Sequence, residues 1–143
     1  MSRHDPLANF RFRVEIDGLA VAFFSEVTLG ASYVDVIQYR EGGDNTIRKL
    51  VGLAHYGNVT LKRGVTQSLD LYQWFRQVVS GQIANARRNV VVILTDEALN
   101  DVARFVIHNA WPVKIEAPTL NAKGNEVAIE SLELTNEGIE RVQ

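Results

Sequence analysis

The stretch that decides the fold is Phe10–Asp17, which reads FRFRVEID and alternates strictly between apolar and charged side chains. Successive side chains of a β-strand point to opposite faces of the sheet, so this pattern predicts a strand with one buried face and one solvent-exposed face. Asp17 and Gly18 follow directly, and both residue types tolerate the positive φ angles of a tight turn. We therefore predict a hairpin whose second strand runs from about Ala20 to Leu29.

Three further stretches carry strand signals. Tyr33–Arg40 alternates, but apolar residues lie on each of its faces. Because it has no clear solvent-exposed face, we expect this strand to belong to a sheet that is covered on both sides, here by a neighbouring subunit. Tyr56–Lys62 also alternates and predicts another strand. Val90–Leu94 is an uninterrupted run of β-branched and aliphatic residues, which predicts a central strand.

The C-terminal third continues the β pattern. Val102–Ile107 predicts a strand that returns after a polar turn. Trp111-Pro112 predicts a bend, because proline forces the residue before it out of helical geometry. In the last predicted strand, Glu126–Leu134, the apolar positions change from odd to even numbers, which is the change of phase that a β-bulge produces.

One helix is predicted in this otherwise β-rich chain. Its apolar stripe recurs at helical spacing, in Leu71, Trp74, Phe75, Val78 and Val79. Ser68 can cap the first turn and Gly81 supplies the left-handed residue that ends the last one, so the helix is expected over Leu69–Ser80. Because Trp74 lies on the stripe, we expect it in the core rather than on a ligand platform.

The region Glu41–Ala54 has no clean periodicity and contains Gly42, Gly43 and Gly52. It predicts a long loop, and structured loops of this length are commonly functional. We therefore interpret it as a contact arm. The residues expected to contact other subunits are Arg40, Glu41, Asp44, Asn45, Arg48, Lys49 and Leu50.

The composition of the 143-residue chain is that of an ordinary globular protein, and we expect one domain over residues 1–143. Its formal net charge of -2 gives no basic field to attract a nucleic-acid backbone or an anionic membrane. The longest apolar run, Val90–Leu94, is far shorter than the ~20 residues that cross a bilayer. Met1–Pro6 is polar and begins no signal peptide, so we expect synthesis in the cytoplasm without membrane insertion.

Motifs that carry chemistry are scarce. The chain has no cysteine, which excludes disulfides, thiolate metal sites and cysteine nucleophiles. His4, His55 and His108 stand apart without the spacing of metal ligands, and no nucleophile elbow surrounds Ser68. Gly42-Gly43 lacks the pattern of a phosphate-binding loop. We therefore expect no catalytic residue, no metal site, no cofactor and no enzymatic activity.

Composition and spacing leave three function classes open. A β-rich domain with a long mixed loop, and with strands that are apolar on both faces, fits a structural subunit that completes itself by association. A small-ligand-binding β-barrel with an apolar interior is the second class. A hydrolase that uses Ser68 or a histidine ranks last, because no triad spacing can be assembled from the sequence.

Five segments carry a resemblance to a known family, namely Asp5–Phe12, Tyr39–Gly43, Tyr56–Gly64, Asn109–Pro112 and Asn125–Glu130. In this order they run over nearly the whole chain, and they resemble the tail-tube proteins of contractile phage tails and of extracellular contractile injection systems. The resemblance implies the fold of those proteins and of the haemolysin-coregulated protein of type VI secretion. That fold is mainly β, with two packed antiparallel sheets that form a small barrel or sandwich and a flanking helix, here Leu69–Ser80.

The resemblance also implies a function. Members of this family form hexameric rings that stack into the inner tube of a contractile particle, with a central channel for cargo protein or DNA. The implied partners are further copies of the chain, the sheath and the baseplate, and the implied location is a phage tail or an extracellular injection particle. A baseplate-proximal adaptor ring is the alternative within the family. In either role, Glu41–Ala54 is expected to reach towards neighbouring subunits or rings.

Overall fold

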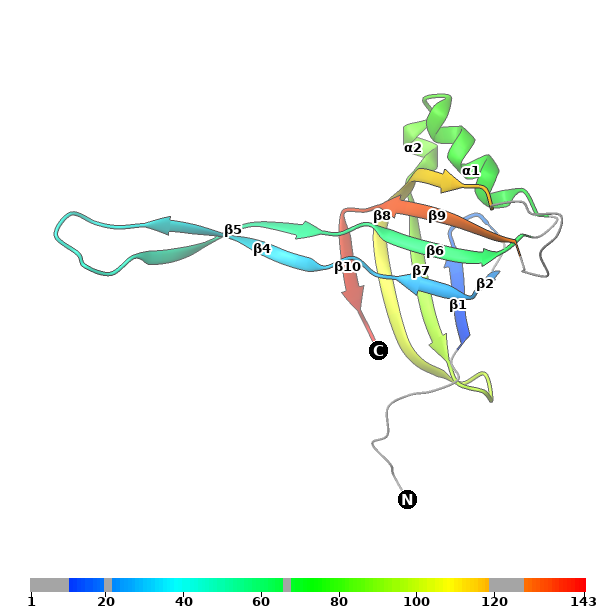
Figure 1. Cartoon of the computed structure of the whole chain (residues 1–143), viewed down its shortest axis with the longest axis horizontal. Coiled ribbons are helices and arrows are strands. Elements are labelled where there is room, and N and C mark those ends of the chain that lie inside the picture. The colour runs from blue at the N-terminus through cyan, green and yellow to red at the C-terminus, as the bar shows by residue number, and fades with distance from the viewer. Residues whose placement is uncertain (1–10, 20–21, 66–67, 119–127) are drawn as a thin grey trace, which may run out of the picture.

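The computed structural model describes residues 11–19, 22–65, 68–118 and 128–143. These residues form a β-rich body from which one long hairpin projects, as Figure 1 shows. The hairpin consists of β4 (Ser32–Tyr39) and β5 (Arg48–Tyr56), which pair only with each other among the described strands. The mainly β, antiparallel fold with its flanking helix confirms the predicted fold class.

The body is one continuous hydrogen-bonded ladder that folds into two packed layers. Its strands follow the order β2-β1-β7-β8-β9-β6-β3, and β10 is added on β8. The first layer consists of β1 (Arg11–Ile16), β2 (Ala22–Phe24), β7 (Arg88–Thr95), β8 (Asp101–Glu116) and β10 (Gly138–Arg141). The second consists of β3 (Glu26–Thr28), β6 (Val59–Gly64), the second part of β8, and β9 (Ile129–Thr135).

Strand β8 belongs to both layers because it bends sharply near its middle. Its first part pairs with β7 and β10, and the part from Trp111 onward pairs with β9. The bend includes Asn109, whose φ angle is 50°, and the backbone N–H of Asn109 donates to the side chain of Asn89 at 3.1 Å. The register shifts on both sides of this point, and such bulges allow one strand to serve two sheets.

The two end strands of this strand order, β2 and β3, follow each other directly in the sequence. The hairpin predicted at Gly18 is confirmed, since β1 and β2 pair across it and the φ angle of Gly18 is 75°. The predicted second strand is nevertheless split at Ser25 into β2 and β3, which lie in different layers. The N–H of Ser25 donates to the carbonyl of Lys62 at 2.9 Å, so the chain passes from one layer to the other at this residue.

Helix α1 (Asp70–Val79) agrees with the predicted helix to within one residue at each end, and Gly81 ends it with a φ angle of 84°. A shorter helix that was not predicted, α2 (Ile83–Ala86), follows. Trp74 is 1% exposed, which confirms its predicted core position, and its Nε1 donates to the carbonyl of Ala86 at 2.6 Å. The rest of the core is aliphatic and comes from both layers, chiefly from Val14, Ile16, Val59, Leu61, Val90, Val92, Ile107, Leu132 and Leu134.

Two other strand predictions are wrong in their limits, and one strand is missing from the predictions. The strand predicted over Tyr56–Lys62 begins only at Val59, because Tyr56 still belongs to β5. The strand predicted to end at Ile107 continues through Pro112 to Glu116, since a shift of register after Pro112 leaves Val113 outside the ladder and accommodates the proline. The C-terminal strand β10 was not predicted.

The bulge predicted in the last strand is also wrong. The part of that prediction before residue 128 lies outside the described residues, and from Ile129 to Leu134 β9 pairs with β6 without any shift of register. The apparent change of phase arises from Glu130, a charged residue at a position that faces the interior, where it pairs with Arg63. The irregularity lies in the neighbouring strand β8 instead.

Candidate functional site

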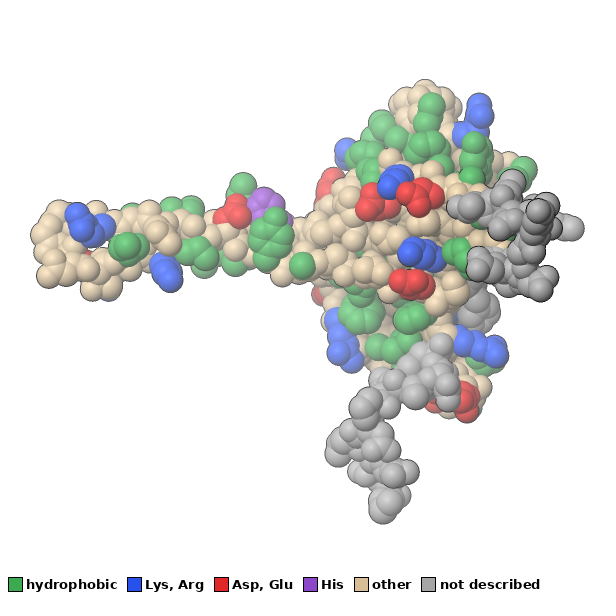
Figure 2. Space-filling model, viewed as in Figure 1, with side chains coloured by type: hydrophobic (Ala, Val, Ile, Leu, Met, Phe, Trp, Pro, Cys, Tyr) green, Lys and Arg blue, Asp and Glu red, His purple; other side chains and the backbone are tan. Residues whose placement is uncertain are grey.

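The hairpin β4–β5 and its connecting loop, residues 32–56, form an arm that stands away from the body (Figures 1 and 2). It exposes ten large apolar side chains, and Val51 and Leu53 are 80% and 73% exposed. The exposed set is Tyr33, Val34, Val36, Ile37, Tyr39, Ile47, Leu50, Val51, Leu53 and Tyr56. Monomeric proteins rarely expose contiguous apolar surface of this kind, so the arm has the character of an interaction surface.

The two faces of the arm differ in chemistry. Side chains alternate between the faces along each strand, and directly opposed residues share a face. One face is mixed, because it carries aromatic, charged and aliphatic side chains. It consists of Tyr33, Asp35, Ile37 and Tyr39 on β4 and of Arg48, Leu50 and His55 on β5. The other face is largely aliphatic, with Val34, Val36 and Gln38 opposite Lys49, Val51 and Ala54. The prediction that Tyr33–Arg40 is apolar on both faces is therefore confirmed, but within the described chain neither face is covered.

A bulge interrupts the arm halfway along its length. Gly52 and Leu53 together oppose Asp35, because the register shifts between Val34 and Val36. A Cβ atom on Gly52 would lie 2.9 Å from that of Asp35, so only glycine leaves room there. The carboxylate of Asp35 lies 2.7 Å from His55 Nε2, and the Tyr33 ring stacks on the imidazole with 4.9 Å between centroids.

The free end of the arm is an ordered turn, and the predicted loop over Glu41–Ala54 is too long. From Arg48 onward the chain is strand β5, so only residues 40–47 connect the two strands. Asp44 organises this connection: its N–H donates to the carbonyl of Glu41 at 3.0 Å, and its carboxylate accepts the N–H of Thr46 at 2.9 Å. The same carboxylate pairs with Arg48 at 3.3 Å.

The structure brings all of the sequence-predicted contact residues to this free end. Arg40, Glu41 and Asn45 lie in the turn, and Arg48, Lys49 and Leu50 form the start of β5. All except Asp44 are exposed, and Asp44 is half-buried because of its bonds within the turn. A shallow hollow beside them is lined by Gln38, Tyr39, Arg40 and Ile47.

The arm joins the body at a narrow neck, which we define as Gly30, Gly57 and Asn136. Gly30 and Gly57 cross with their backbones in contact, and a Cβ atom on Gly57 would lie 2.8 Å from the Cα of Gly30. The side-chain amide of Asn136 donates to the carbonyl of Gly57 at 3.0 Å. Sequence reasoning missed the neck: the strand predicted to end at about Leu29 stops just before Gly30, but the contact of Gly30 with Gly57 exists only in the folded chain.

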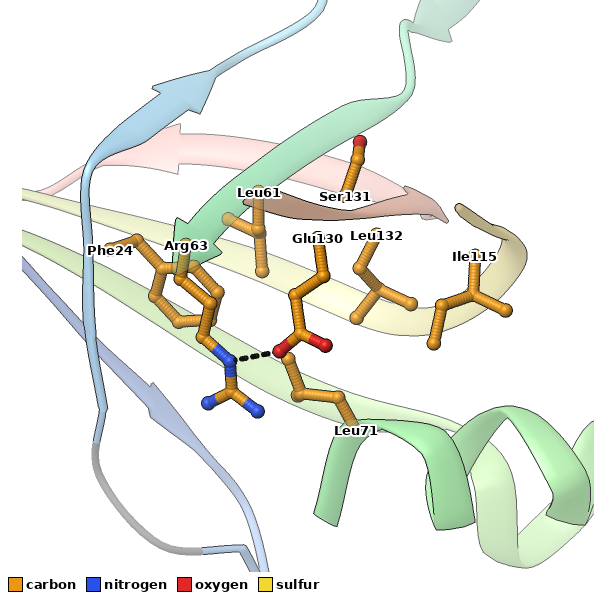
Figure 3. A pocket seen from close by; sticks show the side chains of 8 residues that line it. All are labelled: Phe24, Leu61, Arg63, Leu71, Ile115, Glu130, Ser131 and Leu132. Carbon is orange, nitrogen blue, oxygen red and sulfur yellow. Dashed lines mark hydrogen bonds and ion pairs between the residues drawn. The ribbon is translucent and has the colours of Figure 1, made fainter. Parts of the chain in front are cut away.

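A second cluster of charged side chains lies beside α1 (Figure 3). The side chain of Arg63 is only 6% exposed, and its Nε donates to Glu130 Oε1 while its Nη2 lies 3.2 Å from Asp70 Oδ1. The guanidinium also lies over the ring of Phe24, 5.5 Å from its centroid. Apolar side chains surround the ion pair, including Leu61, Leu71, Ile115 and Leu132.

This cluster shifts the ionisation of one carboxyl group. Partial burial raises the pKa of Asp70, but hydrogen bonds from Ser68, Arg63 and the N–H of Leu71 outweigh it and hold the pKa below its usual value. Arg63 thus binds two carboxylates from β9 and α1 to strand β6. The cluster therefore joins three elements of the fold, β6, α1 and β9, through one guanidinium group.

The other groups considered as chemical candidates are held apart. His55 pairs with Asp35 on the arm, whereas His108 pairs with Glu140 on the body at 3.3 Å, and His4 lies outside the described residues. In the part of the chain that the structure describes, no three histidine or acidic side chains gather as metal ligands. Ser68 precedes the cap residue of α1, and its hydroxyl accepts the N–H of Asp70 at 3.4 Å.

Comparison with known families identifies one match along the sequence. Residues 8–140 match the model of the T4-like virus tail tube protein gp19 family, which is nearly the whole chain. No curated protein matches the chain in sequence. Among the described residues, neither helix has the length and apolarity needed to cross a membrane.

Solved structures share this fold. A chain in the cryo-EM structure of the anti-feeding prophage baseplate, symmetrised six-fold, is 25% identical with a TM-score of 0.76, and the match covers 99% of this chain and 97% of that one. A chain of the sheath-tube complex of the extracellular contractile injection system PVC, in its extended state, is 24% identical with a TM-score of 0.83, over 97% and 93% of the two chains. Hcp1 from Flavobacterium johnsoniae is 13% identical with a TM-score of 0.55, over 92% and 94%.

Proposed function

Because this chain belongs to the family of T4-like virus tail tube proteins, we propose that it is a structural subunit of the inner tube of a phage-tail-like contractile injection system. In this role, the 143 residues act as one tail-tube domain that assembles into stacked hexameric rings with a central channel. The exposed apolar arm is the observation that carries the proposal. A surface of this kind requires a partner, and in a tube that partner is another copy of the chain.

The arm favours an open assembly rather than a closed dimer. It stands out from one side of the body (Figure 1), and we infer that its apolar faces meet a different surface on the next copy. A heterologous contact of this kind repeats from copy to copy and builds either a ring or a filament. We assign the contact at its free end to Arg40, Glu41, Asp44, Asn45, Arg48, Lys49 and Leu50.

The body offers a second means of association. Within the described ladder, β10 pairs only with β8, and β2 at the other end pairs only with β1. Each strand therefore presents an edge with backbone groups that another strand can pair with. Joining the β10 edge of one copy to the β1–β2 edge of the next would continue the sheet around a ring, and the six-fold symmetrised baseplate that contains a similar chain supports six copies per ring.

Other partners follow from the same role. A similar chain occurs in a sheath-tube complex, which supports a sheath protein outside the tube, and another occurs in a baseplate. The channel would carry cargo protein or DNA, and the assembled particle would be a phage tail or an extracellular injection system. As a wall component, the subunit needs no cofactor and no enzymatic activity.

A baseplate-proximal or terminal ring of the same machine is a second candidate role. It is favoured by the similarity to chains in a baseplate and in a tube-terminating cap, the latter with 24% identity and a TM-score of 0.79. A ligand-binding barrel has less support, because aliphatic side chains from both layers fill the interior and Trp74 of α1 packs into the same buried cluster.

Negative-stain electron microscopy of the purified chain, with light scattering for mass, tests the proposal. We expect six-fold rings or tubes for the wild type and a monomer for Leu53→Glu, because the charge would be buried against the next copy. Val79→Glu is the matched control, since Val79 is 70% exposed on α1, away from the arm. A wild-type chain that stays monomeric at high concentration, or a Leu53→Glu variant that assembles like the control, contradicts the proposal.

A further inference from the structure

The arm is fixed to the body by its neck rather than attached through a flexible linker. Gly30 precedes β4 and Gly57 follows β5, so both ends of the arm pass through one point. A Cβ atom on Gly30 would overlap the carbonyl carbon of Gly57, and one on Gly57 would lie 2.9 Å from the nitrogen of Ala31. Neither glycine has a positive φ angle, so it is the close approach of the two backbones that excludes a side chain.

Hydrogen bonds complete this junction on both sides of Gly57. Its N–H donates to the carbonyl of Ala31 at 2.9 Å, and its carbonyl accepts the Nδ2 of Asn136 at 3.0 Å. The Oδ1 of Asn136 in turn accepts the N–H of Gly138 at 3.0 Å, at the start of β10. One half-buried amide therefore uses both of its ends to connect the base of the arm with the C-terminal edge strand of the body.

We propose that the arm is a preorganised connector whose direction is set at the neck by Gly30, Gly57 and Asn136, and that this direction determines how successive copies are oriented. The second half rests on the proposed function, whereas the fixed direction is a property of the single chain. Holding a contact segment in its bound direction before binding removes the ordering cost that a mobile arm has to meet at association.

The length of the arm makes the neck angle decisive. β4 has eight residues, which at about 3.3 Å per residue gives a lever of about 26 Å. A swing of about 10° at the neck therefore displaces the free end by about 5 Å, which is close to the ~4.8 Å spacing between paired strands. An error of this size would move the arm to the wrong strand of its partner.

Pulsed electron–electron double resonance measures the distance between two spin labels and so reports the direction of the arm. The chain has no cysteine of its own, so two introduced cysteines are the only labelling sites. Asn45→Cys at the free end and Glu97→Cys on the body, both exposed, carry the nitroxide labels. For the otherwise wild-type monomer we expect a single narrow distance distribution. Asn136→Asp keeps the acceptor for Gly138 but places an oxygen against the Gly57 carbonyl, and it should widen the distribution at least two-fold.

Asn85→Asp, on the exposed surface of α2, is the control for the added charge and should leave the distribution narrow. If Asn136→Asp unfolds, Asn136→Ser removes the amide donor without adding charge and should widen the distribution in the same way. A broad distribution in the wild type, or a narrow one in a folded variant of Asn136, overturns the fixed direction.

Electron microscopy of the same variants tests the orientation of successive copies. We expect Asn136→Asp to form tubes with irregular or altered rotation between rings, or none, while Asn85→Asp forms regular ones. Regular tubes of unchanged rotation from a variant whose arm has been loosened overturn this half of the proposal. A wild-type chain with a narrow distribution and no assembly supports the neck and counts only against the proposed tube function.

Discussion

Replacing Arg63 by methionine should destabilise the body strongly, because the arginine supplies the positive charge that holds two partly buried carboxylates. The Arg63 side chain is 6% exposed, and the side chains of Asp70 and Glu130 are 17% and 24% exposed. Methionine keeps much of the apolar stem but removes the charge, and with it the contact of the guanidinium with the Phe24 ring. The two carboxylates then lose this shared partner in a place that water reaches poorly.

The expected loss follows from this geometry. Removing one partner of a buried ion pair costs about 3–5 kcal/mol, and because both carboxylates keep some contact with water we expect the lower limit, about 3 kcal/mol. For a chain of this size, 1 kcal/mol corresponds to about 2–4 °C in Tm. Arg63→Met should therefore lower the Tm of the monomer by about 6–12 °C, with a matching fall of the urea midpoint.

The pH dependence separates charge from packing. Since the pKa of Asp70 lies below its usual value in the fold, the stability that this carboxylate contributes is present at neutral pH and is lost as the pH falls through the lowered pKa. The difference between wild type and Arg63→Met should accordingly be large at about pH 7 and should shrink towards about pH 3. An equal difference at both pH values would refute the pairing with the carboxylates as its cause and assign the loss to the pH-independent contact with the Phe24 ring.

A companion variant provides the matched control. Arg63→Met combined with Asp70→Asn and Glu130→Gln removes all three charges, and replacing a whole buried ionic cluster by neutral groups is often nearly neutral. The triple variant should recover much of the stability lost in Arg63→Met. If it is less stable than the single variant, the carboxylates stabilise the fold through partners other than Arg63.

Two further predictions concern α1 and the free end of the arm. Trp74→Ala should lower the free energy of unfolding by about 3–5 kcal/mol. The substitution empties a fully buried site and leaves the Ala86 carbonyl without its donor. An unchanged unfolding midpoint combined with lost assembly would make Trp74 an interface residue instead. Arg48→Glu breaks the ion pair with Asp44 at the surface, so it should change the free energy of unfolding by under about 1 kcal/mol. It should nevertheless reduce the yield of rings or tubes measured by sedimentation. An assembly yield equal to that of the wild type would remove Arg48 from the contact surface.

The strands of the body could be predicted where one face is dry and the other wet. Phe10–Asp17 alternates without interruption, and β1 and its hairpin lie where the pattern places them. Glu130 broke the same rule, since a charged residue that faces the interior imitates a change of phase until its partner Arg63 is known. That pairing joins positions 67 residues apart, and no local pattern reveals it.

One strand of the arm was predicted and the other was not: the strand predicted over Tyr33–Arg40 is β4, whereas most of β5 was read as a loop. Gly52 and Leu53 form a bulge, so the alternation of β5 is lost in the middle of the strand and the segment reads as a loop. Its apolar residues also lie on both faces, which gives no dry side from which to infer a register. The neck is beyond sequence reasoning for another reason, because Gly30, Gly57 and Asn136 come together only after the two layers have packed.

The residues expected to stabilise the fold differ from those expected to contact other copies. A two-stranded hairpin is marginal in water by itself, and the arm buries none of its large apolar side chains against the body core, which is built from both layers and α1. Substitutions at Trp74 or Arg63 should therefore change unfolding, and those at Leu53 or Arg48 should change assembly, with nearly additive effects because the sites share no partner. The neck is the exception: it belongs to the body by its hydrogen bonds and to the arm by its position, so a change at Asn136 should appear in both measurements.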